Sequence, residues 1–168
     1  ALVAALARAV VAEELRSQVI VLSGRRRHLD DIRAAILEHP VASAIGDVTE
    51  ADVGYYVGGM GQTALKQSEG CRVVLATYSM AAEGLDIKSL NSLIFATPMS
   101  DVTQAVGRIL RAVDPEVPPR IIDMVDDYSC FSRQAQKRRR IYKKQGFLDV
   151  VETSPDVPAS AWAGQAQR

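Results

Sequence analysis

The segment "QAVGRILR" (residues 104–111) places one amide and two guanidinium groups where they could hold an anion. At about 100° per residue on a helix, Gln104, Arg108 and Arg111 fall within one narrow stripe, and the apolar residues take the opposite side. Gly107 borders that stripe, and its missing side chain lets another molecule approach closely. Guanidinium groups match phosphate oxygens in a bidentate fashion. The stripe therefore predicts a clamp for a polyphosphate, and a solvated helix face is the alternative.

A second polar segment, "ATYSMAAEGLDI" (residues 76–87), follows an apolar run. Thr77 is expected to end a strand, and the hydroxyls and free backbone amides after it begin a helix, where a phosphate is readily bound. Glu83, Gly84 and Asp86 then stand at the end of that helix. A C-cap explains the glycine, but it does not explain the two flanking carboxylates, which are candidate ligand-binding residues.

The composition is that of a soluble globular protein. The 168 residues are 48% hydrophobic and 24% charged, which suits one domain with a sizeable core. Basic and acidic residues balance at 20 each, so a polyanionic partner must be held by local clusters rather than by a global field. Cys71 and Cys130 form no C-x-x-C pair, and the histidines lack zinc-like spacing. We therefore expect no metal site and an intracellular location, in the cytoplasm or nucleus.

Five short β-branched runs alternate with helical segments. The runs are almost continuously apolar, which is typical of parallel strands covered on both faces; they occupy 19–23, 53–58, 72–77, 92–97 and 120–125. Helices are expected at 29–38, 62–69, 79–84, 102–112 and 129–144. This order predicts an α/β fold with a mostly parallel central sheet flanked by helices, whose ligands gather at the carboxyl ends of the strands.

The two ends of the chain differ in character. The apolar opening (residues 1–15) is shorter than the roughly 20 residues of a membrane-spanning helix and carries three charges, so it predicts a buried amphipathic helix and no membrane contact. Residues 40–52 predict a loop or short excursion. From Thr153 the chain is rich in Pro, Ala and Ser. We expect one domain over residues 1–150 and a poorly ordered tail or linker over 151–168.

The two polar segments, in this order and at this separation, resemble motifs V and VI of superfamily 2 helicases. "VVLATYSMAAEGLDI" is similar to motif V, "QAVGRILR" to motif VI, and "VIVLSGRRRHL" (19–29) to the motif IV region. The resemblance covers about residues 15–145 and implies the second RecA-like domain of such an enzyme, a three-layer α/β structure. "EGLDI", "LIFATP" and "VGRILR" look closest to helicases of large DNA viruses and phages, of the poxvirus transcript-release type.

Motif VI implies catalytic roles for three residues. Arg111 corresponds to the arginine finger and Arg108 to its companion, both directed at the γ-phosphate of ATP bound on the preceding domain. Gln104 corresponds to the residue that senses this phosphate or the attacking water and couples it to the nucleic-acid site.

Motif V implies contacts with both ligands. Gly84 and Asp86, with Glu83 beside them, correspond to positions near the phosphates and the ribose of the nucleotide. Thr77 corresponds to the hydroxyl that contacts a nucleic-acid phosphate. The segment from Thr77 to Gly84 is one residue longer than in the common DEAD-box form.

Two basic clusters are candidates for contact with DNA or RNA. The favoured one is the loop "GRRRH" (24–28) after the first strand, for which the candidate residues are Ser23, Gly24, Arg25, Arg26 and Arg27. The other is "RQAQKRRRIYKK" (133–144), for which phosphate contact and a solvated face are both open. Its side toward the protein body is expected to carry Phe131, Ala135, Arg138 or Arg139, and Tyr142.

The chain lacks the segments with which such motors hold ATP. It contains no G-x-x-x-x-G-K-[ST] segment, and "GGMGQT" (58–63) lacks the lysine that reaches the β- and γ-phosphates, so it is expected to be a turn. The resemblance therefore implies that ATP and its Mg2+ are held by an N-terminal RecA-like domain carrying Walker A and Walker B.

We expect the C-terminal half of an ATP-dependent helicase or translocase, an ATP hydrolase that is inactive as this fragment alone. One alternative is a non-catalytic helicase-like module that binds nucleic acid or a protein partner. A weaker one is a self-sufficient nucleotide-binding protein that uses residues 58–63.

Overall fold

Alternating helices and strands build the part of the chain that the computed structural model describes, which is residues 2–13, 17–38, 47–83, 85–109, 119–125 and 129–147. In order, the elements are α1 (Leu2–Glu13), β1 (Val19–Ser23), α2 (Arg26–Glu38), a 3-10 turn (Glu50–Asp52), β2 (Val53–Tyr56), α3 (Gln62–Ser68), β3 (Val73–Thr77), α4 (Tyr78–Glu83), β4 (Ser92–Phe95), α5 (Thr103–Ile109), β5 (Arg120–Asp123) and α6 (Ser129–Lys144).

The five strands form one sheet in the order β2-β3-β1-β4-β5. Every neighbouring pair is parallel, as the continuous apolar runs predict. The strands begin within one residue of the expected positions and end up to two residues earlier. The α/β class is thus confirmed, with all strands parallel in the described part of the chain.

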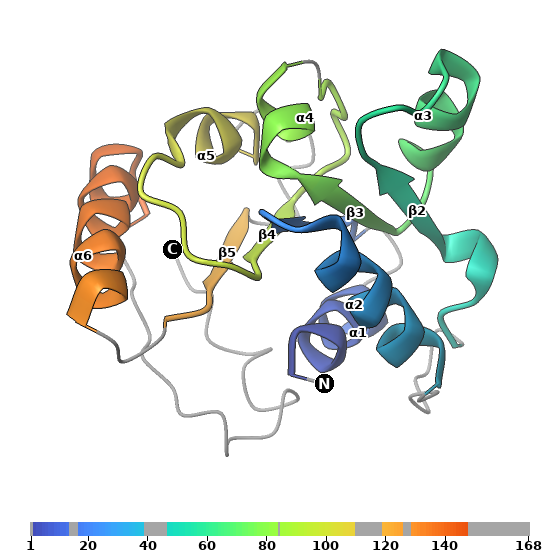
Figure 1. The fold of residues 1–168 in the computed structure, drawn as a ribbon, viewed down its shortest axis with the longest axis horizontal. Helices are drawn as coiled ribbons and strands as arrows, with labels where there is room; N and C mark the ends of the chain where they lie inside the picture. The colour runs from blue at the N-terminus through green and yellow to red at the C-terminus, as the bar shows by residue number, and fades with distance from the viewer. Residues whose placement is uncertain are drawn as a thin grey trace.

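Helices cover both faces of the sheet (Figure 1). On one face, Ala7 of α1 and Leu29 of α2 pack on Val19 and Val21 of β1. On the other face, β1 contributes the intervening residues to a second cluster that also holds side chains of α3, α4, α5 and α6; its members include Ile20, Leu22, Leu65, Ala81, Val106 and Tyr142. The strand period of two therefore divides the core into two layers of apolar side chains.

The helix α2 begins earlier than the sequence predicts. It starts at Arg26 rather than at residue 29, so Arg26 and Arg27 lie in its first turn and not in a loop. The backbone N–H of Leu29 donates to the carbonyl of Arg25 and closes that turn. The pattern misses this start because the first buried position of the helix is Leu29, and the exposed residues before it carry no apolar signal.

Several expectations lie outside the described residues. These are most of the segment 40–52 and the whole tail 151–168. The expected helix at the N-terminus is present as α1. Within the described residues, no helix is long and apolar enough to span a membrane.

Candidate functional site

The carboxyl ends of β1, β3 and β4 bring three candidate segments together. Ser23 lies opposite Thr77 in the register of β1 and β3. On the other side of β1, the backbone N–H of Gly24 donates to Oγ1 of Thr97 at 2.9 Å. After β1 the chain continues to β2 on one side of the sheet, and after β4 it continues to β5 on the other side. The contact between Gly24 and Thr97 therefore lies where the strand order reverses. Open α/β sheets bind their ligands at such a position.

The first strand end presents exposed cations over a buried hydroxyl. Gly24, Arg25, Arg26 and Arg27 are all exposed, whereas Ser23 is fully buried. Oγ of Ser23 accepts a hydrogen bond from the N–H of Arg25 at 3.2 Å and lies 3.1 Å from Nδ1 of His28. Ser23 therefore shapes the start of α2, while the arginines are free to meet a ligand from solvent.

One hydroxyl at the end of β3 and another in the first turn of α4 lie close together. Thr77 is half-buried, and its Oγ1 lies 3.3 Å from Oγ of the exposed Ser79 at the start of α4. Because Thr77 is the register partner of Ser23, its hydroxyl lies at the same sheet edge as the exposed arginines. The sequence-predicted nucleic-acid residues thus come together, with Ser23 beneath them.

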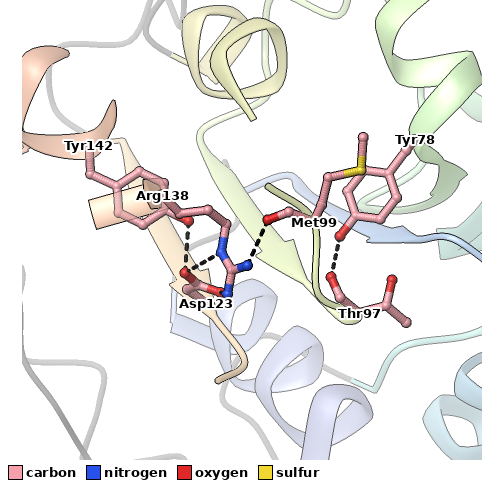
Figure 2. Close-up of polar contacts among 6 residues, drawn as sticks. All are labelled: Tyr78, Thr97, Met99, Asp123, Arg138 and Tyr142. Atoms are coloured by element: carbon pink, nitrogen blue, oxygen red, sulfur yellow. Dashed lines mark hydrogen bonds and ion pairs between the residues drawn. The ribbon is translucent and has the colours of Figure 1, made fainter. Parts of the chain in front are cut away.

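Thr97 makes hydrogen bonds with both of the other segments, and Figure 2 shows the one with Tyr78. Besides accepting from Gly24, it accepts at its carbonyl oxygen a 2.5 Å hydrogen bond from the hydroxyl of Tyr78. Tyr78 directly follows Thr77, and burial of its ring raises the pKa of its phenol. Thr97 therefore joins the end of β1, the start of α4 and the loop that leads to α5.

The helix α5 carries Gln104 and Arg108, two members of the predicted stripe. Oδ1 of Asp101 accepts the N–H of Thr103 at 3.1 Å, and this hydrogen bond lowers the pKa of that carboxyl. Val106 is fully buried and Gln104 is exposed, as the helical spacing predicts. A Cβ built on Gly107 would meet no heavy atom of the described chain within 4 Å. Packing among the described residues therefore does not require the glycine.

The remaining nucleotide-binding candidates are partly described. Glu83 and Asp86 are exposed at the exit of α4, which packs against α5 (Figure 1). The motif V and motif VI segments are thus neighbours on one face of the sheet. Gly84, the side chain of Arg108 and the whole of Arg111 lie outside the described residues. Their roles remain predictions.

A buried ion pair fixes α6 beside this region, and the sequence does not reveal its acidic partner. Arg138 is 1% exposed and donates from Nε and Nη2 to the two carboxylate oxygens of Asp123, at 2.8 Å each. Its Nη1 donates to the carbonyl of Met99 at 2.7 Å, and the hydroxyl of Tyr142 donates to Asp123 at 2.9 Å (Figure 2). The helix therefore contacts both β5 and the loop that precedes α5.

Burial of these groups changes their acidity. Desolvation and the negative charge of Asp123 raise the pKa of the Tyr142 phenol well above its usual range. For Arg138, burial alone would lower the pKa, but hydrogen bonds and the charge of Asp123 outweigh it and raise the pKa. Of the two arginines that helical spacing allowed on the inner side of α6, the structure selects Arg138 and leaves Arg139 half-buried.

Residues 58–61 of the glycine-rich segment form a turn, as expected, and Gln62 and Thr63 begin α3. Gly58 and Gly59 connect β2 to α3, and Gly59 has a φ of 86°, which favours glycine. The helix that follows is only seven residues long. Among the described residues, no group of three or more His, Cys, Asp or Glu could hold a metal ion.

Comparisons with known proteins give viral relatives and a shared fold. The chain is 36% identical over 135 residues to a protein of Acanthamoeba polyphaga mimivirus named "Putative ATP-dependent RNA helicase L396", covering 80% of this chain and 25% of that protein. It is 36% identical over 103 residues to "Putative ATP-dependent RNA helicase QP509L" of African swine fever virus, covering 60% and 20%. The chain thus spans about a quarter or less of the length of these relatives.

A solved structure supports the fold independently. The yeast protein Dbp5 from S. cerevisiae, solved with RNA and ADP BeF3, superimposes with a TM-score of 0.60 at 15% identity, covering 96% of this chain and 39% of the other. At this identity the likeness concerns the fold alone. No family model matches the chain.

Proposed function

We propose that the chain is the C-terminal motor half of an ATP-dependent nucleic-acid helicase or translocase of superfamily 2, because it is similar to viral proteins named as putative ATP-dependent RNA helicases and shares the fold of Dbp5. One observation carries the proposal. The segments that resemble motifs IV and V lie at the carboxyl ends of two adjacent parallel strands, β1 and β3. Thr97, in the loop that leads into motif VI, is hydrogen-bonded to both segments, through Gly24 and Tyr78.

In the proposed division of labour, an N-terminal domain binds ATP and Mg2+, and α5 completes the site from outside. ATP supplies the reactive γ-phosphate; Arg111 and Arg108 stabilise the charge that develops on it, and Gln104 senses it. An arginine finger supplied in this way is worth roughly 10³–10⁵ in rate. The open space at Gly107 fits this proposal, because a surface that docks against a nucleotide on another domain needs room beside the stripe.

In the same proposal, the strand ends hold the sugar-phosphate backbone. Arg25, Arg26, Arg27 and Thr77 can contact phosphates, which position a strand without reading its sequence. A motor must release each base that it passes, so backbone contact suits it. Because the names of the viral relatives refer to RNA helicases, single-stranded RNA is the first ligand to test, and DNA of the same sequence is the second.

The isolated chain is expected to show no appreciable ATP hydrolysis, because its sequence contains neither a G-x-x-x-x-G-K-[ST] segment nor a DExx box after a strand. The test is steady-state phosphate release by the pure 168-residue chain, with and without single-stranded RNA or DNA. Robust turnover would overturn the two-domain proposal and restore the turn 58–63 as a nucleotide site.

A further inference from the structure

The helix α6 is a strongly cationic element in a protein of no net charge. Its sequence "SCFSRQAQKRRRIYKK" holds seven of the 20 basic residues and no acidic residue. One of the seven, Arg138, is neutralised by Asp123. The helix itself supplies no carboxylate near the other six.

Four of these cations form a single exposed row, which we call the basic stripe: Arg133, Lys137, Arg140 and Lys144. At about 100° per residue they fall within about 60° of the helix circumference. Ala135, Arg138 and Tyr142 are buried on the opposite side. The contacts of Arg138 and Tyr142 therefore fix the direction in which the stripe faces.

A solvated helix face does not account well for the stripe. Like charges three or four residues apart on a helix destabilise it by about 0.2–0.5 kcal/mol per pair. The stripe contains three such pairs in a row, and among the described residues none of its members has an acidic partner. The helix dipole favours cations in the last turn, which explains Lys144 but not Arg133 or Lys137.

We propose that the basic stripe of α6 binds the phosphate backbone of a nucleic-acid strand, as a second contact separate from the strand ends of β1 and β3. The proposal rests on the function proposed above and extends it. At 1.5 Å per residue the stripe is about 16 Å long, and a stacked strand carries one phosphate per about 3.4 Å. The stripe can therefore span about five phosphates.

The chemistry of this face favours a nucleic acid over an acidic protein. The exposed residues of α6 are Cys130, Gln136 and basic residues, without an aromatic or aliphatic side chain among them. Protein interfaces are depleted in lysine and centre on buried aromatic or apolar side chains. The face also offers no aromatic ring on which a base could stack, so it suits backbone contact.

The test compares two charge-matched double variants of the 168-residue chain. Lys137→Gln with Arg140→Gln removes two charges from the stripe, and Lys66→Gln with Lys88→Gln removes two exposed charges elsewhere. Lys66 lies on α3, beside the opposite edge of the sheet from α6 (Figure 1). The probe is a fluorescein-labelled mixed-sequence 20-nucleotide RNA, with DNA of the same sequence as a second arm. Binding is followed by anisotropy from 50 to 200 mM salt.

Each lost phosphate contact lowers the slope of log K against log salt by about 0.7 for single strands. The stripe variant should therefore reduce the steepness of the fall of log K with log salt by about 1.4. Over this fourfold salt range, the affinity of the parent should then fall by a factor about sevenfold larger than that of the variant. The Lys66 and Lys88 variant should keep the parental slope. The charge-preserving pair Lys137→Arg with Arg140→Lys should keep it too, which separates lost charge from altered folding.

The proposal would be overturned if log K of the stripe variant fell with log salt as steeply as that of the parent, or as steeply as that of the Lys66 and Lys88 variant. So would the absence of binding by the parent chain. Neither result decides the motor function, because that is measured separately as ATP turnover by the longer protein.

Discussion

The backbone N–H of Gly24 donates to Oγ1 of Thr97 at 2.9 Å, joining two strand ends that are 73 residues apart in the chain. The contact connects the exposed arginines after β1 to the loop that leads into α5. It therefore connects the segment of the proposed nucleic-acid contacts with the loop before the helix that carries Gln104, the proposed sensor of ATP. A bound strand that displaced Gly24 would disturb this hydrogen bond and therefore the position of Thr97.

Replacing Thr97 by valine should loosen this link. Valine keeps the branched shape but removes the acceptor, so the free energy of unfolding should fall by about 0.5–1.5 kcal/mol and single-strand affinity should fall with it. Thr97→Ser, which retains the hydroxyl, is the control and should remain close to the parent. Urea unfolding and anisotropy measure the two effects. A valine variant equal to the parent in both would show that the contact is incidental.

The ion pair between Arg138 and Asp123 should be a major determinant of stability. Asp123→Asn leaves the guanidinium buried without a counter-charge, and breaking one partner of a buried pair costs about 3–5 kcal/mol. Arg140→Ala, on the exposed side of the same helix, should change the stability by no more than about 0.5 kcal/mol. Urea unfolding at constant pH makes the comparison. Equal losses in the two variants would contradict the burial of Arg138.

The raised pKa of Tyr142 predicts a loss of stability at alkaline pH. The unfolded phenol ionises near pH 10, whereas the folded phenol, beside the carboxylate of Asp123, stays protonated to higher pH. The contribution of this phenol to the free energy of unfolding is therefore complete below about pH 10. It is lost as the pH rises from there toward the pKa of the folded state, by up to about 1.4 kcal/mol per pH unit.

Tyr142→Phe provides the measurement. At pH 7 it should lower the free energy of unfolding by about 1.5–3 kcal/mol, because it removes a hydrogen bond to a charged group. Between pH 10 and 12 the difference from the parent should shrink. Tyr55 and Tyr78, whose pKa values are also raised, are common to both proteins and cancel. Parallel pH profiles would refute the assignment.

Replacing Arg25, Arg26 and Arg27 together by alanine should weaken single-strand binding for all sequences alike. The three side chains are exposed, so the fold should be retained. If each contacts one phosphate, the salt slope should fall by about 2. The measurement is a salt titration by anisotropy on two unrelated sequences. An unchanged slope would mean that these arginines do not contact the strand, and a sequence-dependent loss would mean that they contact bases.

The fold was predictable where the signal is local. Continuous apolar runs such as "VIVLS" require cover on both faces, and this fixes parallel strands and alternating helices. The start of α2 was missed because Arg26 and Arg27 are exposed and charged. The contact between Gly24 and Thr97 could not be predicted, because it depends on β1 lying beside β4, which the sequence leaves open. The pairing of Arg138 with Asp123 depends on the same non-local sheet order.

The central claim is that Arg111 acts on ATP bound to another domain. It is tested by ATP binding and steady-state hydrolysis of the proposed two-domain enzyme, for the parent, Arg111→Ala and Arg111→Lys. The Arg111→Ala enzyme should bind ATP almost normally but lose hydrolysis by roughly 10³-fold or more, because the charge is needed mainly in the transition state. Lysine should restore little, since an ammonium cannot reproduce the guanidinium fork. Normal hydrolysis by Arg111→Ala would contradict the account and return residues 104–111 to a solvated helix face.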